Sequence, residues 1–121
     1  MARIHAYNAN EVVGVIAANR GLLLVHFGSP LASSCEFIRK ELQAIAPLFE
    51  GRVQLAEVEL PLQDVEVLRK YAIEEIPTLI LFQGSDEVER LEKILLPDEF
   101  RGFLDSCASF YGSGESPKAL E

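Results

Sequence analysis

The chain of 121 residues has no tryptophan, one methionine and only two cysteines, Cys35 and Cys107. Two cysteines cannot build a disulfide framework, and their spacing fits no zinc motif, so we expect no metal site. No apolar run approaches the ~20 residues that a membrane-spanning helix needs. The N-terminal residues lack the apolar segment and cleavage site of a secretory signal peptide. These absences predict a cytoplasmic protein that does not span a membrane.

Positive charge is also scarce, with 11 Lys and Arg against 19 Asp and Glu, which gives a net charge of −8. Nucleic acids and anionic membrane surfaces are therefore unfavourable partners. Apolar residues make up 49% of the chain, enough for a packed core at this length. We predict one domain over residues 1–111. Residues 112–121 contain Gly, Ser and Pro without periodicity, which indicates a flexible tail.

The hydrophobic pattern alternates between strands and helices and then ends in a hairpin and a last helix. We expect strands at 3–7, 22–27, 53–60, 78–82 and 87–94. The first helix begins after Asn8, whose spacing to Glu11 matches a capping box, and stops at Gly21. Further helices are expected at about 36–49, at 62–71 and from Pro97 onward. This order predicts an α/β fold, a central mixed sheet with helices on both faces.

The most informative stretch runs from the strand Leu22–Phe27 into the next helix. His26 is the only polar residue of this apolar run, whose length fits a strand buried on both faces. Ser33 and Ser34 could cap a helix that begins near Cys35. A thiol at the start of a helix can be reactive, so Cys35 is the candidate catalytic residue. The alternative is that Cys35 is a small buried apolar residue and that His26 is a core histidine.

Two segments resemble the thioredoxin family. The run Leu31-Ala32-Ser33-Ser34-Cys35 lies where that family has Trp-Cys-Gly-Pro-Cys. Residues 71–82, Tyr-Ala-Ile-Glu-Glu-Ile-Pro-Thr-Leu-Ile-Leu-Phe, are similar to the family's segment that carries its cis-proline. The resemblance covers about residues 3 to 108. It implies a thioredoxin-like fold with a cis bond between Ile76 and Pro77.

The resemblance also implies that ordinary disulfide reduction is lost. Ala32 stands in place of the family's first, attacking cysteine, and Cys35 matches the second, resolving cysteine. Gly28 and Leu31 replace tryptophans, and His26 replaces a buried aspartate. Dithiol exchange needs both thiols. Iron–sulfur binding in related folds uses the missing first cysteine, so we expect no cofactor.

Two functions remain open. The first is a redox-inactive module for protein binding, chaperoning or assembly, whose groove pairs with an extended segment of another protein. The second is a single-cysteine protein that forms mixed disulfides through Cys35 with glutathione or a partner. Acidic residues beside the groove favour a basic target. The expected groove consists of Leu31, Ala32, Ile76 and Pro77, with Leu95 and Leu96 nearby and Glu74 and Glu75 beside it.

We also predict a buried polar pair. Where the family often has aspartate and lysine on neighbouring strands, this chain has His26 and Glu57. If their pairing outweighs burial, the pKa of His26 should lie above its usual value of about 6.5.

Overall fold

The computed structural model describes residues 4–29, 33–60 and 65–112. The elements, in chain order, are β1 (His5–Tyr7), α1 (Ala9–Ala18), β2 (Leu22–Gly28), α2 (Ser33–Phe49), β3 (Gln54–Glu59), α3 (Val65–Lys70), β4 (Thr78–Gln83), β5 (Asp86–Leu91) and α4 (Pro97–Gly112). Their order confirms the predicted alternation of strands and helices with a final hairpin.

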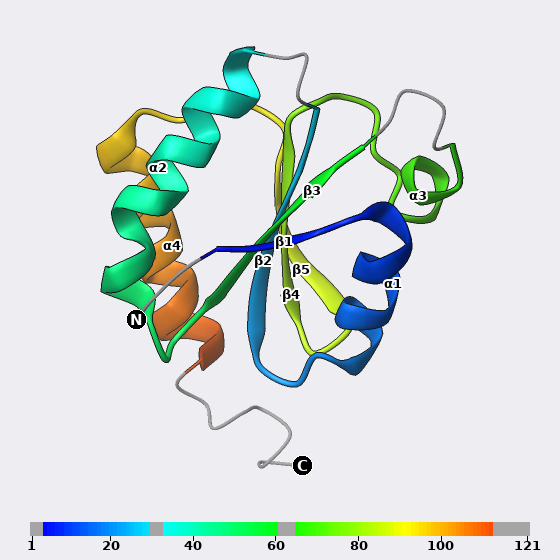
Figure 1. The fold of residues 1–121 in the computed structure, drawn as a ribbon. Coiled ribbons are helices and arrows are strands. Elements are labelled where there is room, and N and C mark those ends of the chain that lie inside the picture. Colours follow the sequence, from blue (N-terminus) through cyan, green and yellow to red (C-terminus); the bar gives the residue numbers. More distant parts are fainter. Residues whose placement is uncertain (1–3, 30–32, 61–64, 113–121) are drawn as a thin grey trace.

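The five strands form one mixed sheet in the order β1-β3-β2-β4-β5. β1 and β2 pair with β3 in parallel, whereas β4 is antiparallel to β2 and to β5. Helices α2 and α4 cover one face, and α1 and α3 cover the other (Figure 1). The predicted α/β fold is therefore confirmed. No described helix is long and apolar enough to cross a membrane.

β2 is the central strand, and all seven of its residues are buried. Leu24 faces the core under α2 and α4, whereas Val25 and Phe27 face the core under α1. This alternation puts the even-numbered residues His26 and Gly28 on the α2 face, because neighbouring side chains of a strand point to opposite faces.

The predicted capping box of α1 is present. The Asn8 side chain accepts a hydrogen bond from the Glu11 N–H at 2.8 Å, and the Glu11 carboxylate accepts one from the Asn8 N–H at 2.9 Å. The helix ends at Ala18, before the expected Gly21, because Asn19 adopts an extended backbone and its side chain donates to the carbonyls of Gly21 and Gly84.

Some boundaries differ from the predictions. α2 begins at Ser33, so Ser33 and Ser34 lie inside its first turn and do not precede it, and the helix continues through Pro47. β5 ends at Leu91 and not at 94, because Leu91 already pairs with Leu79 and β4 begins only one residue earlier. The start of the third expected helix, at 62, lies outside the described residues. α4 includes Gly112, the first residue of the expected tail, and residues 113–121 are not described.

Candidate functional site

Cys35 lies in the first turn of α2 and is only 1% exposed. The backbone N–H of Ser29, directly after β2, donates a hydrogen bond to its Sγ at 3.4 Å. The sulfur therefore accepts a bond at the junction of β2 and α2, where it is shielded from bulky reagents. Both cysteines are free thiols, and Cys107 lies in α4, buried on the side that faces the core.

His26 lies beneath this thiol. It is 1% exposed, and neither ring nitrogen has a hydrogen-bond partner among the described residues. A Cβ added to Gly28 would lie 2.9 Å from His26 Nε2 and 3.0 Å from Cys35 Sγ. The imidazole and the thiol thus converge on one point above the Gly28 backbone, and only glycine leaves room for both.

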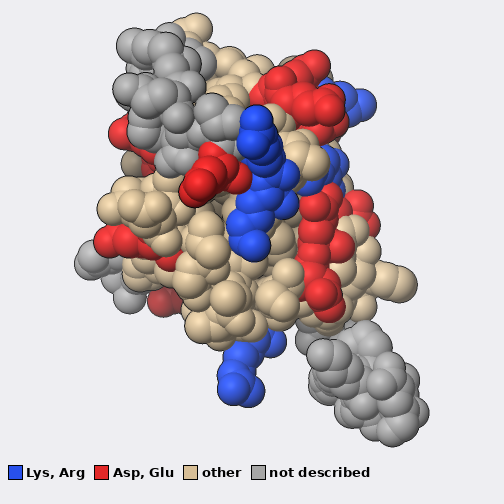
Figure 2. Space-filling view, turned by 90° about the vertical axis from the view of Figure 1, so that its right-hand side faces the viewer, with Lys and Arg blue, Asp and Glu red and all other residues tan. Residues whose placement is uncertain are grey.

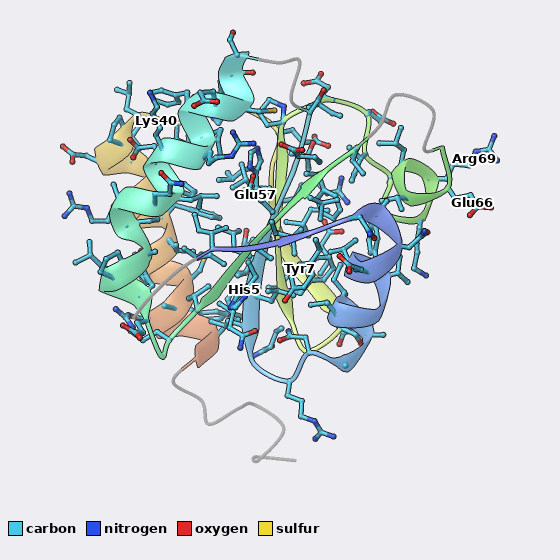
Figure 3. All side chains as sticks on the ribbon, in the orientation of Figure 1. His5, Tyr7, Lys40, Glu57, Glu66 and Arg69 are labelled. Atoms are coloured by element: carbon cyan, nitrogen blue, oxygen red, sulfur yellow. The ribbon has the colours of Figure 1, made fainter. Side chains whose placement is uncertain are left out.

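The predicted pair of His26 and Glu57 is not formed. The two residues are register partners on β2 and β3, yet the Glu57 Oε2 accepts a hydrogen bond from Arg39 Nε at 2.8 Å. Figure 3 shows Glu57 between α2 and the sheet. Burial of the imidazole, together with the positive charge of Arg39, lowers the pKa of His26 from 6.5 to about 4. The expectation of a raised pKa is therefore wrong, and the ring is neutral at pH 7.

Arg39 is the residue that the sequence analysis missed. Its guanidinium also bonds Glu59 at 3.1 Å and Glu36 at 3.2 Å. The hydrogen bond that Arg39 donates to Glu57 is the main reason that the pKa of Arg39 is raised. Glu57 and Glu59 are two apart on a strand and so share a face. That spacing was a signal in the sequence that a cation could lie over this face, but it did not identify α2 as its source.

The described part of the expected groove consists of Ile76 and Pro77, both half-buried and joined by a cis peptide bond. Thr78, which is fully buried, donates its hydroxyl to the carbonyl of Glu75 at 2.6 Å and so ties this corner together. None of the described residues hydrogen-bonds to the backbone N–H or carbonyl of Ile76. The other two groove residues, Leu31 and Ala32, lie outside the described residues.

Apolar side chains are exposed at the same edge of the sheet. Thr78 pairs with Phe27 at the end of β2, and Leu79 pairs with Leu91 at the end of β5. The loop after β5 therefore leaves the sheet beside Pro77. In this loop Ile94 is 45% exposed and Leu96 is 68% exposed. Leu95, by contrast, packs partly against the core.

The charged side chains of the described residues form neither a basic binding surface on the face shown in Figure 2 nor a metal site. On the face shown in Figure 2, Lys and Arg side chains are flanked by Asp and Glu, so this face has no continuous basic surface. Within residues 4–29, 33–60 and 65–112, no group of three His, Cys, Asp or Glu side chains could hold a metal ion.

Comparison with known proteins supports the resemblance of this chain to the thioredoxin family and its α/β fold. The family model described as thioredoxin matches residues 4–106. Glutaredoxin-3 of Bos taurus is 33% identical over 103 residues, which are 82% of this chain and 30% of that protein. Thioredoxin 1 of a Nostoc species is 30% identical over 67 residues, which are 55% of this chain and 62% of that protein. The chain thus spans less than a third of the length of the bovine relative and less than two thirds of that of the Nostoc relative. The match of the family model over most of its length shows that this chain belongs to the thioredoxin family.

Proposed function

We propose that this protein is a redox-inactive thioredoxin-like module that binds an extended segment of another protein at the corner formed by Ile76 and Pro77. The observation that carries the proposal is the backbone of Ile76, to which no described residue hydrogen-bonds. An N–H and a carbonyl that the described residues leave without a partner beside a sheet can pair with an added strand. Ala32, aligned with the family's attacking cysteine, has no nucleophile, so nothing in this mode of binding depends on a thiol.

The side chains around Ile76 indicate which residue types a bound segment should contain. Ile94 and Leu96 offer apolar surface at this edge, which favours a segment with apolar side chains. Glu74 and Glu75 are both exposed next to Ile76, which favours basic residues in the segment. A partner with alternating apolar and basic residues in an extended conformation fits both features.

To test the proposed surface, an exposed apolar residue beside it, Leu96, is compared with one that lies away from it, Phe110. Binding of an extended peptide with alternating Leu and Lys is measured by fluorescence anisotropy for the wild type, Leu96→Asp and Phe110→Asp. Phe110 is 75% exposed but lies near the other end of α4. Leu96→Asp should weaken binding about 10-fold or more, since an apolar contact of ~1.5 kcal/mol is replaced by a charge. Phe110→Asp should leave the affinity unchanged. Equal effects of the two variants, or no binding by the wild type, would reject the proposed surface.

An insulin-type disulfide reduction assay tests the absence of redox activity. We expect no turnover above the uncatalysed rate. Turnover that disappears in Cys35→Ser would instead favour the second candidate, a single-cysteine protein that forms mixed disulfides through Cys35. The observation that favours this candidate is the position of Cys35 in the first turn of α2 with the Ser29 N–H on its sulfur. Its exposure of only 1% is the reason that it ranks second.

A further inference from the structure

We propose that Arg90 is a positioning residue that holds the segment between α3 and β4 in the one conformation that presents Ile76 to a partner. What this inference says about a partner rests on the proposed function. The conformation of the segment is a property of the free protein and is measured by itself. Two observations carry the inference: the hydrogen bonds of the Arg90 guanidinium and the backbone conformation of Ala72.

Arg90 lies on β5 but bonds the start of this segment. Its Nη2 donates to the carbonyl of Tyr71 at 2.6 Å, and its Nη1 donates to the carbonyl of Ala72 at 3.0 Å. These two residues directly follow α3. The carboxylate of Glu87 accepts two further bonds from the same guanidinium, from Nε and from Nη2, both at 2.8 Å. The two-point bond to Glu87 fixes the plane of the guanidinium, so its other N–H groups point at the two carbonyls.

Ala72 has a backbone conformation that alanine rarely adopts. Its φ is +52°, in the left-handed region, where a Cβ crowds the following carbonyl oxygen. The N–H of Ala72 bonds the carbonyl of Arg69 at 3.1 Å, and the N–H of Ile73 bonds the carbonyl of Leu68 at 2.8 Å. This pair of bonds is the Schellman motif, in which glycine usually takes the left-handed position. Alanine at this position needs further contacts that stabilise the conformation.

Arg90 supplies those contacts. The carbonyls of Tyr71 and Ala72 belong to the two peptide groups on either side of the Ala72 Cα. Donors fixed at both peptide groups restrict the φ and ψ angles of the residue between them. Arginine can do this because its N–H groups point in separate, fixed directions, whereas the ammonium of lysine is a single point of charge. Arg90 thereby stabilises the left-handed conformation of Ala72.

Arg90 also connects the two ends of the segment 73–77. β4 begins at Thr78, directly after Pro77, and Ile80 of that strand is the register partner of Arg90. The segment therefore starts next to a residue that Arg90 holds and ends at the strand that pairs with β5. A short segment fixed at both ends has few conformations, which lowers the conformational entropy that is lost when a partner binds its backbone.

The test measures the hydrogen exchange of single amides by NMR in the wild type, in Arg90→Lys and in Arg101→Lys. Arg90→Lys keeps the charge but cannot bond both carbonyls and Glu87 at once. Arg101→Lys is the same substitution at an exposed arginine of α4. In Arg90→Lys the N–H groups of Ala72 and Ile73 should exchange at least ~10-fold faster, whereas those of the buried strand β2 should change less than ~3-fold. Arg101→Lys should change neither set.

The affinity for the extended peptide with alternating Leu and Lys is measured on the same proteins. It should fall about 3- to 10-fold in Arg90→Lys, because the peptide must then order the segment as it binds. Arg101→Lys should bind the peptide as the wild type does. Glu87→Gln removes the charge that orients the guanidinium and should change exchange and affinity in the same direction. It replaces Arg90→Lys if circular dichroism shows that the latter is unfolded.

Unchanged exchange at Ala72 and Ile73 in the folded variant would overturn the proposal, as would an equal increase in β2. An unchanged peptide affinity in a variant whose exchange has increased at these two residues would overturn it too. If the wild type does not bind the peptide, the proposed function is rejected, and the exchange rates still decide whether Arg90 holds the segment.

Discussion

At the scale of single residues, His26 is the most unusual feature of this core. It is a neutral imidazole whose two nitrogens find no partner in the described part of the chain, and it lies in a strand whose other residues are apolar or glycine. In the unfolded chain the same ring is hydrated and can take up a proton near pH 6.5. A buried polar group without a partner costs about 1–3 kcal/mol, so His26 opposes folding even when it is neutral.

This residue predicts an acid-sensitive stability. Because the folded pKa of His26 is lowered from 6.5 to about 4, the unfolded chain binds the proton first as the pH falls. The free energy of unfolding should therefore decrease as the pH drops below 6.5, by about 2 kcal/mol between pH 7 and pH 5, with the loss complete only below the folded pKa of about 4. Urea unfolding at pH 7 and at pH 5 measures this change in the free energy of unfolding. His26→Leu should lack this part of the pH dependence, and an unchanged slope in that variant would contradict the assignment.

Gly28 allows a second prediction at this scale. A Cβ at this position would lie 3.0 Å or less from both His26 and Cys35, so one of the two side chains must move. Gly28→Ala should lower the free energy of unfolding by about 1–3 kcal/mol. Gly14→Ala in the middle of α1 is the matched control, since a Cβ there has nothing within 4 Å outside its own helix. It should raise stability by about 0.5–1 kcal/mol. The prediction fails if the two substitutions act alike in urea unfolding.

At the scale of elements, Arg39 is the polar link between α2 and β3. Its guanidinium bonds carboxylates of both elements, and one of them, Glu57, has a side chain that is only 12% exposed. The fork-shaped guanidinium selects one position, because its separate N–H groups bond Glu57 and Glu59 at the same time.

Arg39→Ala should therefore destabilise the protein by about 1–3 kcal/mol, since it leaves the half-buried Glu57 carboxylate without its Arg39 partner. Arg101→Ala is the control. The Arg101 guanidinium lies 3.9 Å from Asp98, and both side chains are largely exposed. An exposed pair of this kind contributes at most ~1 kcal/mol and commonly nothing that can be measured. Thermal unfolding measures the loss of stability in both variants. A similar loss in Arg39→Ala and Arg101→Ala would mean that the Arg39 link between α2 and β3 contributes no more than an exposed ion pair.

At the scale of the whole molecule, the chain has a net charge of −8, and one edge of its sheet carries exposed apolar residues. Charge acts over longer distances than apolar contact and is screened by salt. The charge should therefore mainly set the association rate constant of a basic segment, and the exposed apolar residues should mainly set its dissociation rate constant.

Raising the ionic strength from about 0.05 M to about 0.5 M should lower the association rate constant of a basic peptide about 10-fold, with a smaller effect on its dissociation. Stopped-flow fluorescence measures both constants. Glu75→Gln should lower the association rate at low salt, because Glu75 lies next to Ile76. Asp86→Asn removes the same charge at the first residue of β5, at the opposite end of the sheet. If Asp86→Asn has the larger effect, the peptide binds elsewhere.

Much of the fold followed from local patterns in the sequence. The apolar run before Gly28, the capping box of Asn8 and Glu11, and the strand after Pro77 each depend on residues a few positions apart. Backbone propensity and periodicity act at that range, so the order of elements and the buried central strand could be predicted. The likeness of residues 31–35 and 71–82 to the thioredoxin family identified the fold and the loss of the first cysteine.

The chemistry around Cys35 was decided only by tertiary structure. From the sequence alone, an ion pair between His26 and Glu57 was a reasonable prediction, and the register of β2 and β3 does bring the two residues side by side. The choice depended on Arg39, which reaches Glu57 from α2 across the interface between helix and sheet. Likewise, the strand pattern placed His26 and Gly28 on one face, but it could not reveal that Cys35 would approach the same point. Hydrogen bonds and ionisation depend on distances of a few ångströms between distant segments, and those distances exist only once the helix has packed onto the sheet.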